Sequence, residues 1–241
     1  MKLYIIRHAD PDYAADSLTP RGWQEARLLA QRLARIPAAG YYVSPLGRAQ
    51  ATASLTLQAA GAQAQTRDWL REFSGWTVDE ASGERRIPWD FLPQQWTPDK
   101  RYYDRDRWGG PLLHRGTVRR EYRRVCAGLD ELLAAHGYQR SGQCYRAVRP
   151  NEDTVMLFCH FGVECVLLSH LCGISPMVLW HQFVALPSSV TVLATEERRP
   201  GVALWRLQRF GDLSHLDAAG QEPSFAARFC ETFANTQQRH D

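Results

Sequence analysis

Two arginines and two histidines stand at the ends of apolar segments that are far apart in the sequence. Arg7 and His8 directly follow the apolar residues 3–6, and His160 ends the run "DTVMLFCH". Arg48 lies in "SPLGRAQAT", just after the apolar stretch "YYV". Guanidinium groups match the oxygens of phosphate in bidentate geometry. An imidazole whose other nitrogen is hydrogen-bonded can act as a nucleophile. These residue types therefore indicate a site for a phosphoryl group.

The four side chains can act together only if the apolar segments are neighbouring strands. We expect strands at residues 2–6, 41–44 and 153–159, because each is short and apolar almost throughout. Strands that alternate with helices indicate a parallel sheet, and ligands bind outside the carboxyl ends of such strands. A weaker strand within residues 64–72 would bring Glu72 to the same edge.

The rest of the pattern predicts a three-layer α/β/α fold, with a mainly parallel sheet and helices on both faces. Thr19 and Pro20 are suited to the N-cap and the first position of a helix. Further predicted elements are helices at 17–36, 46–61, 117–136, 163–172 and 224–236, a polar hairpin or loop at 138–153, and two strands, 188–196 and 201–210, forming a hairpin at the sheet edge. Nothing marks a linker, so we expect a single domain over residues 1–241.

The region from about residue 76 to 115 interrupts this pattern and is interpreted as an irregular, lid-like insertion. It contains four tryptophans and four prolines without a long helical period. Long irregular segments inside a compact domain are often functional lids, and the aromatic content argues against disorder. The tryptophans either form a satellite core or cover the site and select the substrate. Residues 100–124 carry nine basic and three acidic side chains, either a solvated face or a funnel for an anionic substrate.

The composition narrows the class of protein. A net charge of +3 is too small to indicate nucleic-acid binding by itself, and no apolar run has transmembrane length. The N-terminus lacks the pattern of a signal peptide. The six cysteines form no CxxC pair and no His/Cys metal spacing, and several lie in apolar runs where a free cysteine is a small buried hydrophobe. We therefore expect a cytoplasmic globular protein without membrane or nucleic-acid partners.

The motifs in combination resemble the histidine phosphatase superfamily, whose fold is phosphoglycerate-mutase-like. The resemblance rests on "RHAD", "SPLGRAQAT", "LRE" and "CHFG", and "LTPRGWQEA" is similar to the family's L-T-x-x-G-x-x-Q-A helix start. It implies metal-independent hydrolysis of a small phosphorylated metabolite through a phosphohistidine intermediate, without a cofactor. It covers most of the chain except the insertion.

The resemblance also implies roles for individual residues. His8 matches the nucleophile, Arg7 and Arg48 match the phosphate clamp, and His160 matches the second histidine of the pocket, which stabilises the transferring group. Glu72 matches the carboxyl proton donor of an L-x-E motif. Such a donor must keep its proton near neutral pH, so its pKa must be raised.

Other polar residues near these motifs have open roles. Ser44 either contacts the phosphate or serves as a turn or N-cap residue, and Thr52 is expected to pack the helix rather than bind a ligand. Asp10 and Asp12 follow the nucleophile where carboxylates are unfavourable beside an anion, unless they point away or bind a substrate hydroxyl or amine.

Two alternative functions fit the same fold. A phosphoglycerate-type mutase is one, although "EFSGW" lacks the longer E-R-H-Y-G motif of that branch. A non-catalytic module that binds a phosphorylated ligand or a protein is the other, although such a module has no need of His8. The sequence does not specify the substrate or the oligomeric state.

Overall fold

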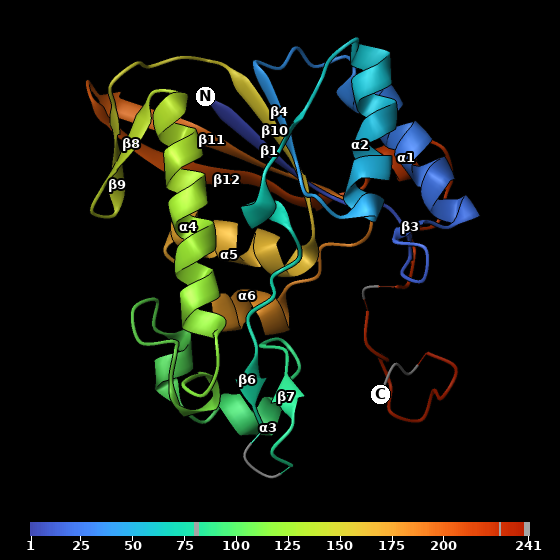
Figure 1. The fold of residues 1–241 in the computed structure, drawn as a ribbon, viewed down its shortest axis with the longest axis vertical. Helices are drawn as coiled ribbons and strands as arrows, with labels where there is room; N and C mark the ends of the chain where they lie inside the picture. Colours follow the sequence, from blue (N-terminus) through green and yellow to red (C-terminus); the bar gives the residue numbers. More distant parts are fainter. Residues whose placement is uncertain (80–81, 227, 239–241) are drawn as a thin grey trace.

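The computed structural model describes residues 1–79, 82–226 and 228–238 (Figure 1). Its strands are β1 (Lys2–Arg7), β2 (Pro11–Asp12), β3 (Ser17–Leu18), β4 (Gly40–Val43), β5 (Gln65–Thr66), β6 (Thr77–Val78), β7 (Arg85–Arg86), β8 (Tyr138–Ser141), β9 (Cys144–Ala147), β10 (Thr154–Cys159), β11 (Val190–Arg199) and β12 (Val202–Asp212). Its α-helices are α1 (Pro20–Leu33), α2 (Gly47–Ala60), α3 (Pro93–Trp96), α4 (Val118–Ala135), α5 (Phe161–Cys172), α6 (Pro176–Gln182) and α7 (Ser214–Asp217).

The central sheet has a parallel half and an antiparallel half. Its order is β5-β4-β10-β1-β11-β12-β9-β8, and β5, β4, β10 and β1 run parallel. The register pairs Arg7 with Cys159 and Phe158 with Val43, so β1, β10 and β4 end at one level. The residues that follow these three strands therefore meet at the carboxyl edge, as the sequence predicts.

Helices cover both faces of this sheet, which confirms the expected three layers. Along β1, Leu3 and Ile5 belong to one apolar core, shared with α4, α5 and α6. Ile6 belongs to a second core on the opposite face, shared with α1 and α2. Side chains point alternately to the two faces of a strand, and both faces of the central strands are covered. These strands are therefore apolar nearly throughout, without a polar residue at every second position.

The expected helix boundaries are confirmed at several caps. Thr19 caps α1 by accepting a hydrogen bond from Gly22, with Pro20 at the first helical position. Gly61 and Gly173 end α2 and α5 in the left-handed conformation that favours glycine. None of the helices in the described part of the chain has the length and apolarity needed to cross a membrane.

The strand expected within 64–72 is present as β5, but it is short, because the chain then turns into a 3₁₀ helix, Asp68–Leu70, whose Leu70 is fully buried. Two other expectations about the elements are wrong. The β11–β12 hairpin is not at the sheet edge, since the β8–β9 hairpin pairs beyond it.

The second error concerns the C-terminal segment. Turns replace the helix expected at 224–236, of which residue 227 lies outside the description. Phe229 and Phe233 are largely exposed, so an apolar helix face would find little to pack against. Short helices gain most of their stability from such packing.

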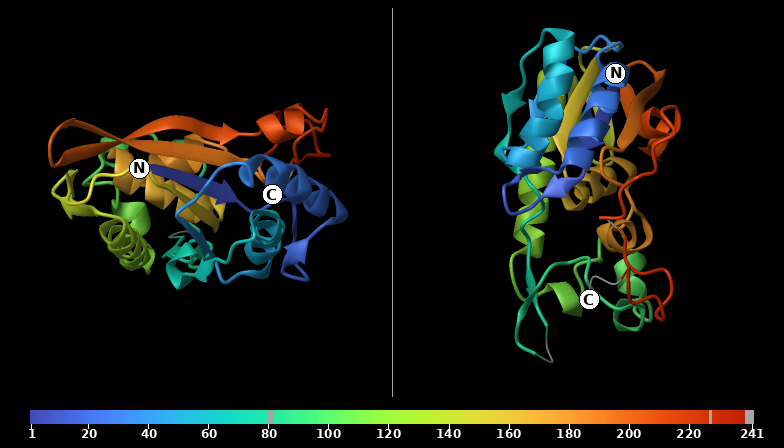
Figure 2. Two further views of the ribbon diagram at one scale, coloured as in Figure 1. Left: turned by 90° about the horizontal axis from the view of Figure 1, so that it is seen from above. Right: turned by 90° about the vertical axis from the view of Figure 1, so that its right-hand side faces the viewer.

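The insertion forms the end of the molecule opposite the N-terminus, beyond the carboxyl edge of the sheet (Figures 1 and 2). It contains β6, β7, α3 and two 3₁₀ turns, Lys100–Tyr103 and Pro111–Leu113. Trp96 and Trp108 are buried in the core shared with α4 and α5, whereas Trp76 and Trp89 stay partly exposed. Trp96 and Trp108 therefore fit the first alternative, a core, whereas the partial exposure of Trp76 and Trp89 leaves a role in covering the site open.

Candidate active site

The backbone of Arg7 and His8 is held from both sides at the end of β1. The Arg7 N–H donates to the Ser189 carbonyl at 3.1 Å, and the His8 N–H donates to the Cys159 carbonyl at 3.0 Å. Both side chains are buried, His8 almost completely. An arginine and a histidine at the end of a buried strand are therefore rigidly placed groups.

His8 has a fixed tautomer. Its Nδ1 lies 2.8 Å from the Ala9 carbonyl oxygen, which can only accept, so Nδ1 carries the proton and Nε2 keeps its lone pair. Burial, reinforced by the charge of Arg7, lowers the pKa of His8 well below its usual value. The imidazole is therefore neutral at neutral pH, as a nitrogen nucleophile requires.

His160 lies against His8, with the ring centroids 5.0 Å apart. Its Nε2 is 2.7 Å from the Ser44 hydroxyl oxygen. The same oxygen accepts a hydrogen bond from the Leu46 N–H at 3.2 Å. Burial lowers the pKa of His160 well below its usual value, so the ring is neutral. When the Ser44 hydroxyl donates its hydrogen to Nε2, that nitrogen must be unprotonated. The single proton of the neutral ring is then on Nδ1. That nitrogen is buried and has no hydrogen-bond partner among the described residues.

The two arginines are each anchored at one end and free at Nε. Arg7 donates from Nη1 to the Ala185 carbonyl at 2.5 Å, and Arg48 donates from Nη1 to Asp16 at 2.7 Å. The Nε atoms of both arginines are buried and have no hydrogen-bond partner within the described ranges. The site thus gathers three buried nitrogens that lack partners among the described residues, one each from Arg7, Arg48 and His160.

Glu72 reaches the same site from the chain after the 3₁₀ turn. Its Oε1 accepts from the Phe73 N–H at 2.8 Å and from the Val163 N–H, in the first turn of α5, at 3.3 Å. The residue keeps some exposed area, but protein atoms surround its carboxyl closely. This burial raises its pKa, against the pull of the Phe73 hydrogen bond and of Arg7. A raised pKa is the property required of a proton donor.

The carboxylates that follow the nucleophile turn away from it. Asp10 accepts from the Thr19 hydroxyl at 2.6 Å and from the Ser224 hydroxyl. Asp12 accepts from the N–H groups of Ala14 and Ala15, at 3.0 and 3.2 Å, which builds the turn between β2 and β3. Both carboxylates therefore shape the loop after His8. This is the first of the two options left open by the sequence, in which they point away from the anion.

Thr52 joins the loop after His8 to helix α2. Its hydroxyl accepts from the Ala9 N–H at 3.0 Å and donates to the Arg48 carbonyl at 2.8 Å. It is fully buried, in line with the expected packing role.

Two further acidic residues at the site were missed by the sequence analysis. Asp16 pairs with Arg48, and Glu164 is buried in the first turn of α5. The available signal for Glu164 was an acidic residue within the otherwise apolar run "CHFGVECVLL". Asp16 had no such signal, because an aspartate in a polar loop is ordinary.

No group of three or more histidine, cysteine or acidic side chains within the described ranges is arranged to hold a metal ion. The groups gathered at the carboxyl edge are instead a neutral histidine, two arginines and a carboxyl with a raised pKa. On an α/β/α fold, such a set is suited to phosphoryl transfer.

The chain belongs to the histidine phosphatase superfamily (branch 1), which it matches over residues 3–208. This membership identifies it as an enzyme of the histidine phosphatase class and confirms the resemblance found in the sequence. No curated protein matches the chain at a significant level.

Solved structures share this fold at low sequence identity. A phosphoserine phosphatase variant from Entamoeba histolytica, in complex with phosphoserine, is 19% identical with a TM-score of 0.57, covering 89% of this chain and 98% of its own. A mycobacterial glucosyl-3-phosphoglycerate phosphatase is 19% identical with a TM-score of 0.60, covering 87% and 98%. A putative α-ribazole-5'-phosphate phosphatase from Escherichia coli is 21% identical with a TM-score of 0.56, covering 88% and 97%.

Proposed function

We propose that the chain hydrolyses phosphomonoesters of small metabolites without a metal ion, through a phosphohistidine at His8. The observation that carries this proposal is a set of three buried nitrogens, from Arg7, Arg48 and His160, that have no hydrogen-bond partner in the described part of the chain and lie beside a neutral histidine. Buried donors normally have partners, and a phosphoryl group would supply the missing acceptors. The names of the three structural neighbours described above, each a phosphatase of a small phosphorylated compound, support the substrate class.

In the first step, His8 Nε2 attacks phosphorus, the P–N bond forms and the bond from phosphorus to the ester oxygen breaks. Arg7, Arg48 and His160 hold the three remaining oxygens and stabilise their charge, since phosphoryl transfer needs mainly positioning and electrostatics. Glu72 gives its proton to the leaving alkoxide, so the alcohol departs neutral.

In the second step, water attacks the phosphohistidine. The Glu72 carboxylate takes a proton from the water, the P–N bond breaks and inorganic phosphate leaves. His8 regains its neutral tautomer, held by the Ala9 carbonyl. Ser44 acts through His160, because its hydroxyl is engaged by that ring.

We also propose that residues 1–241 form one histidine phosphatase domain with an insertion at about 76–115. The apolar core supports this view, because Trp96 and Trp108 of the insertion share it with Leu3 of β1.

The central test is His8→Ala, with His170→Ala as the matched control, since His170 lies near the C-terminal end of α5 and pairs with Asp130 of α4. We expect His8→Ala to abolish hydrolysis of p-nitrophenyl phosphate and the acid-labile phosphate trapped on the protein, while the control keeps both. EDTA should leave the rate unchanged. Native activity in His8→Ala would refute the mechanism, and a metal-restored loss in EDTA would refute metal independence. Phosphate transferred between hydroxyls without net release would indicate a mutase instead.

A further inference from the structure

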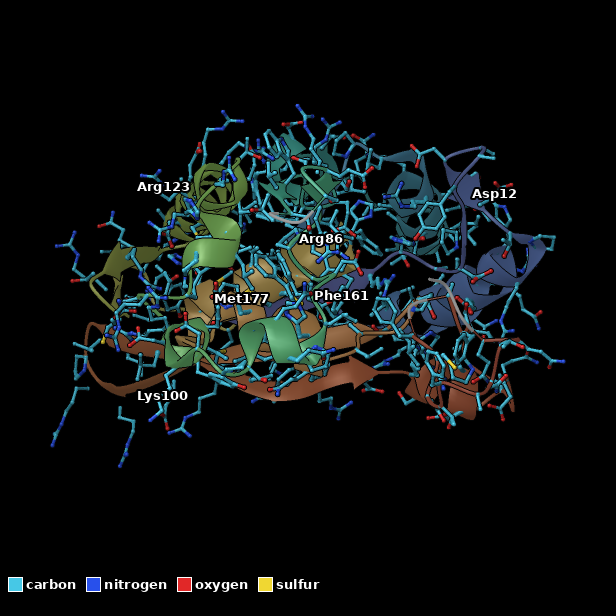
Figure 3. The ribbon with its side chains drawn as sticks, turned by 90° about the horizontal axis from the view of Figure 1, so that it is seen from below. Asp12, Arg86, Lys100, Arg123, Phe161 and Met177 are labelled. Carbon is cyan, nitrogen blue, oxygen red and sulfur yellow. The ribbon has the colours of Figure 1, made fainter. Side chains whose placement is uncertain are left out.

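Each of three active-site groups has an aromatic ring beside it. The Arg48 guanidinium lies 5.4 Å from the centre of the Tyr13 ring, and the Arg7 guanidinium lies 5.6 Å from the centre of the Phe161 ring. Tyr13 is 64% exposed and Phe161 is partly exposed. Seen from the end of the molecule that carries the insertion, Phe161 lies near the centre of the view (Figure 3).

The third ring belongs to Trp89 of the insertion and lies beside the proton donor. Gly162 shows how close the two are: a Cβ on this glycine would lie 2.6 Å from the Trp89 ring and 2.8 Å from Glu72 Oε1. A larger residue at this position would have to displace both side chains. Trp89 also packs against Phe73 and Trp180, with ring centroids 6.5 and 6.2 Å apart, and so has a defined position.

Trp89 remains partly exposed although it packs against a large buried core. Its ring lies on the side of the site that Glu72 occupies. Tyr13, Phe161 and Trp89, which we call the aromatic rim, come from three separate segments: the loop after His8, the start of α5 and the insertion.

We propose that the aromatic rim binds the leaving group, and that the preferred substrates are phosphate monoesters of uncharged, apolar or aromatic alcohols. This inference rests on the function proposed above. An aromatic ring in the leaving group would stack on the rings of the rim or contact them edge to face. Such contacts add to the binding free energy gained from burying apolar surface.

A charged leaving group is less well matched. The cations that act on Glu72 are Arg7 and Arg48, which the phosphoryl group itself engages. The next cation along the chain, Arg71, also acts on His160, but it is 41% exposed at its side chain and pairs with Asp68 at 3.6 Å. A substrate carboxylate brought against the rim would lose its hydration without gaining a dedicated partner.

The test compares alkyl phosphates whose leaving alcohols differ in apolar character. The probes are benzyl phosphate, glycerol 3-phosphate, phosphoserine and 3-phosphoglycerate, so no probe gains from an unusually good leaving group. We expect the native enzyme to have a kcat/KM for benzyl phosphate at least about tenfold above that for the other three.

The variants are Trp89→Phe and Trp89→Leu, with Trp76→Phe as the matched control. Trp76 is a tryptophan of the same insertion that instead stacks on Arg85, 4.2 Å from its ring centre. We expect Trp89→Leu to lower kcat/KM for benzyl phosphate by roughly 3- to 10-fold. The kcat/KM for phosphoserine should stay within about twofold of the native value. Trp89→Phe should lose less, and Trp76→Phe should match the native enzyme.

The outcomes separate this inference from the proposed function. Hydrolysis that depends on His8 but favours phosphoserine or 3-phosphoglycerate over benzyl phosphate would overturn the inference and leave the mechanism standing. An equal loss on all probes in Trp89→Leu would also overturn it. Absence of hydrolysis with every probe would instead contradict the proposed function. The order of kcat/KM among the four probes is measured on the native enzyme. It therefore tests the inference even if the Trp89→Leu protein folds poorly.

Discussion

Asp16 holds Arg48 with one carboxylate oxygen and the start of α2 with the other. Its Oδ1 lies 2.7 Å from Arg48 Nη1, and its Oδ2 accepts from the Gly47 N–H at 2.7 Å. Asp16 has a φ of +44°, a conformation that costs energy for most residues other than glycine. Gly47 is equally constrained, because a Cβ there would lie 2.1 Å from the Asp16 carbonyl oxygen. This local strain supports an arginine whose Nε stays available.

Asp16→Asn is expected to weaken the binding of inorganic phosphate by roughly 5- to 10-fold, because Arg48 loses a charged partner that fixes its orientation. Asparagine tolerates a positive φ, and its amide oxygen can still accept from Gly47, so the start of α2 stays capped. The measurement is the inhibition constant of phosphate against p-nitrophenyl phosphate.

An Arg48→Ala background shows whether Asp16 acts through Arg48. In that background Asp16→Asn should have no further effect on phosphate binding, since the coupled partner is gone. Tighter phosphate binding in Asp16→Asn alone would mean that Asp16 competes with phosphate for Arg48, and the positioning role would be wrong.

Ser44→Ala is expected to lower kcat/KM by about tenfold without preventing folding. Removing the hydroxyl lets the proton of His160 occupy either ring nitrogen, so the donor on Nδ1 is present only part of the time. Ser169→Ala is the matched control, because this buried serine bonds to the Tyr122 hydroxyl away from the site. If Ser44→Ala and the control behave alike, Ser44 has only a structural role.

Glu72→Gln is expected to lower kcat/KM for an alkyl phosphate by about 10²- to 10⁴-fold, the usual size of general acid catalysis. The loss on p-nitrophenyl phosphate should be much smaller, because nitrophenolate leaves without a proton. Burial raises the pKa of Glu72, so this carboxyl keeps its proton at pH values where an ordinary glutamate is ionised. The native rate on alkyl phosphates should therefore persist at those pH values and fall as the pH rises through the raised pKa. Rate profiles against pH for both substrates provide the measurement, and equal losses on both would contradict the role.

The parts of this structure that the sequence predicted follow from local physics. A buried parallel strand such as β10 must be apolar throughout, so the residue just after it, His160, is conspicuous as a polar exception. Caps such as Thr19 and Gly61 require particular residue types, so helix boundaries were predictable within a few residues.

The remaining features depend on contacts between distant segments. Asp16 becomes distinctive only when the β2–β3 turn places it against Arg48. The closeness of Trp89 to Glu72 needs the insertion to fold back onto Gly162, which no periodicity encodes. The expected C-terminal helix failed for the same reason, since the sequence of residues 224–236 does not specify whether a packing surface exists.

Glu164→Gln is expected to change how stability depends on pH. The Glu164 carboxyl is 1% exposed, and neither oxygen makes a hydrogen bond of normal geometry within the described residues. Burial raises its pKa to about 7, although the Thr191 hydroxyl and the Arg7 charge oppose the shift. The folded state therefore holds this proton more tightly than the unfolded state does, where the pKa is 4.5.

The stability that this proton supports is fully present below about pH 4.5 and is lost as the pH rises through about 7. The loss amounts to roughly 3 kcal/mol at alkaline pH. Glutamine carries no such proton, so the free energy of unfolding of Glu164→Gln, relative to the native chain, should rise between pH 5 and pH 8. Urea unfolding at both pH values measures this difference, with Glu152→Gln, at an exposed position, as the control. A difference that does not change with pH would show that Glu164 is ionised in the folded state throughout.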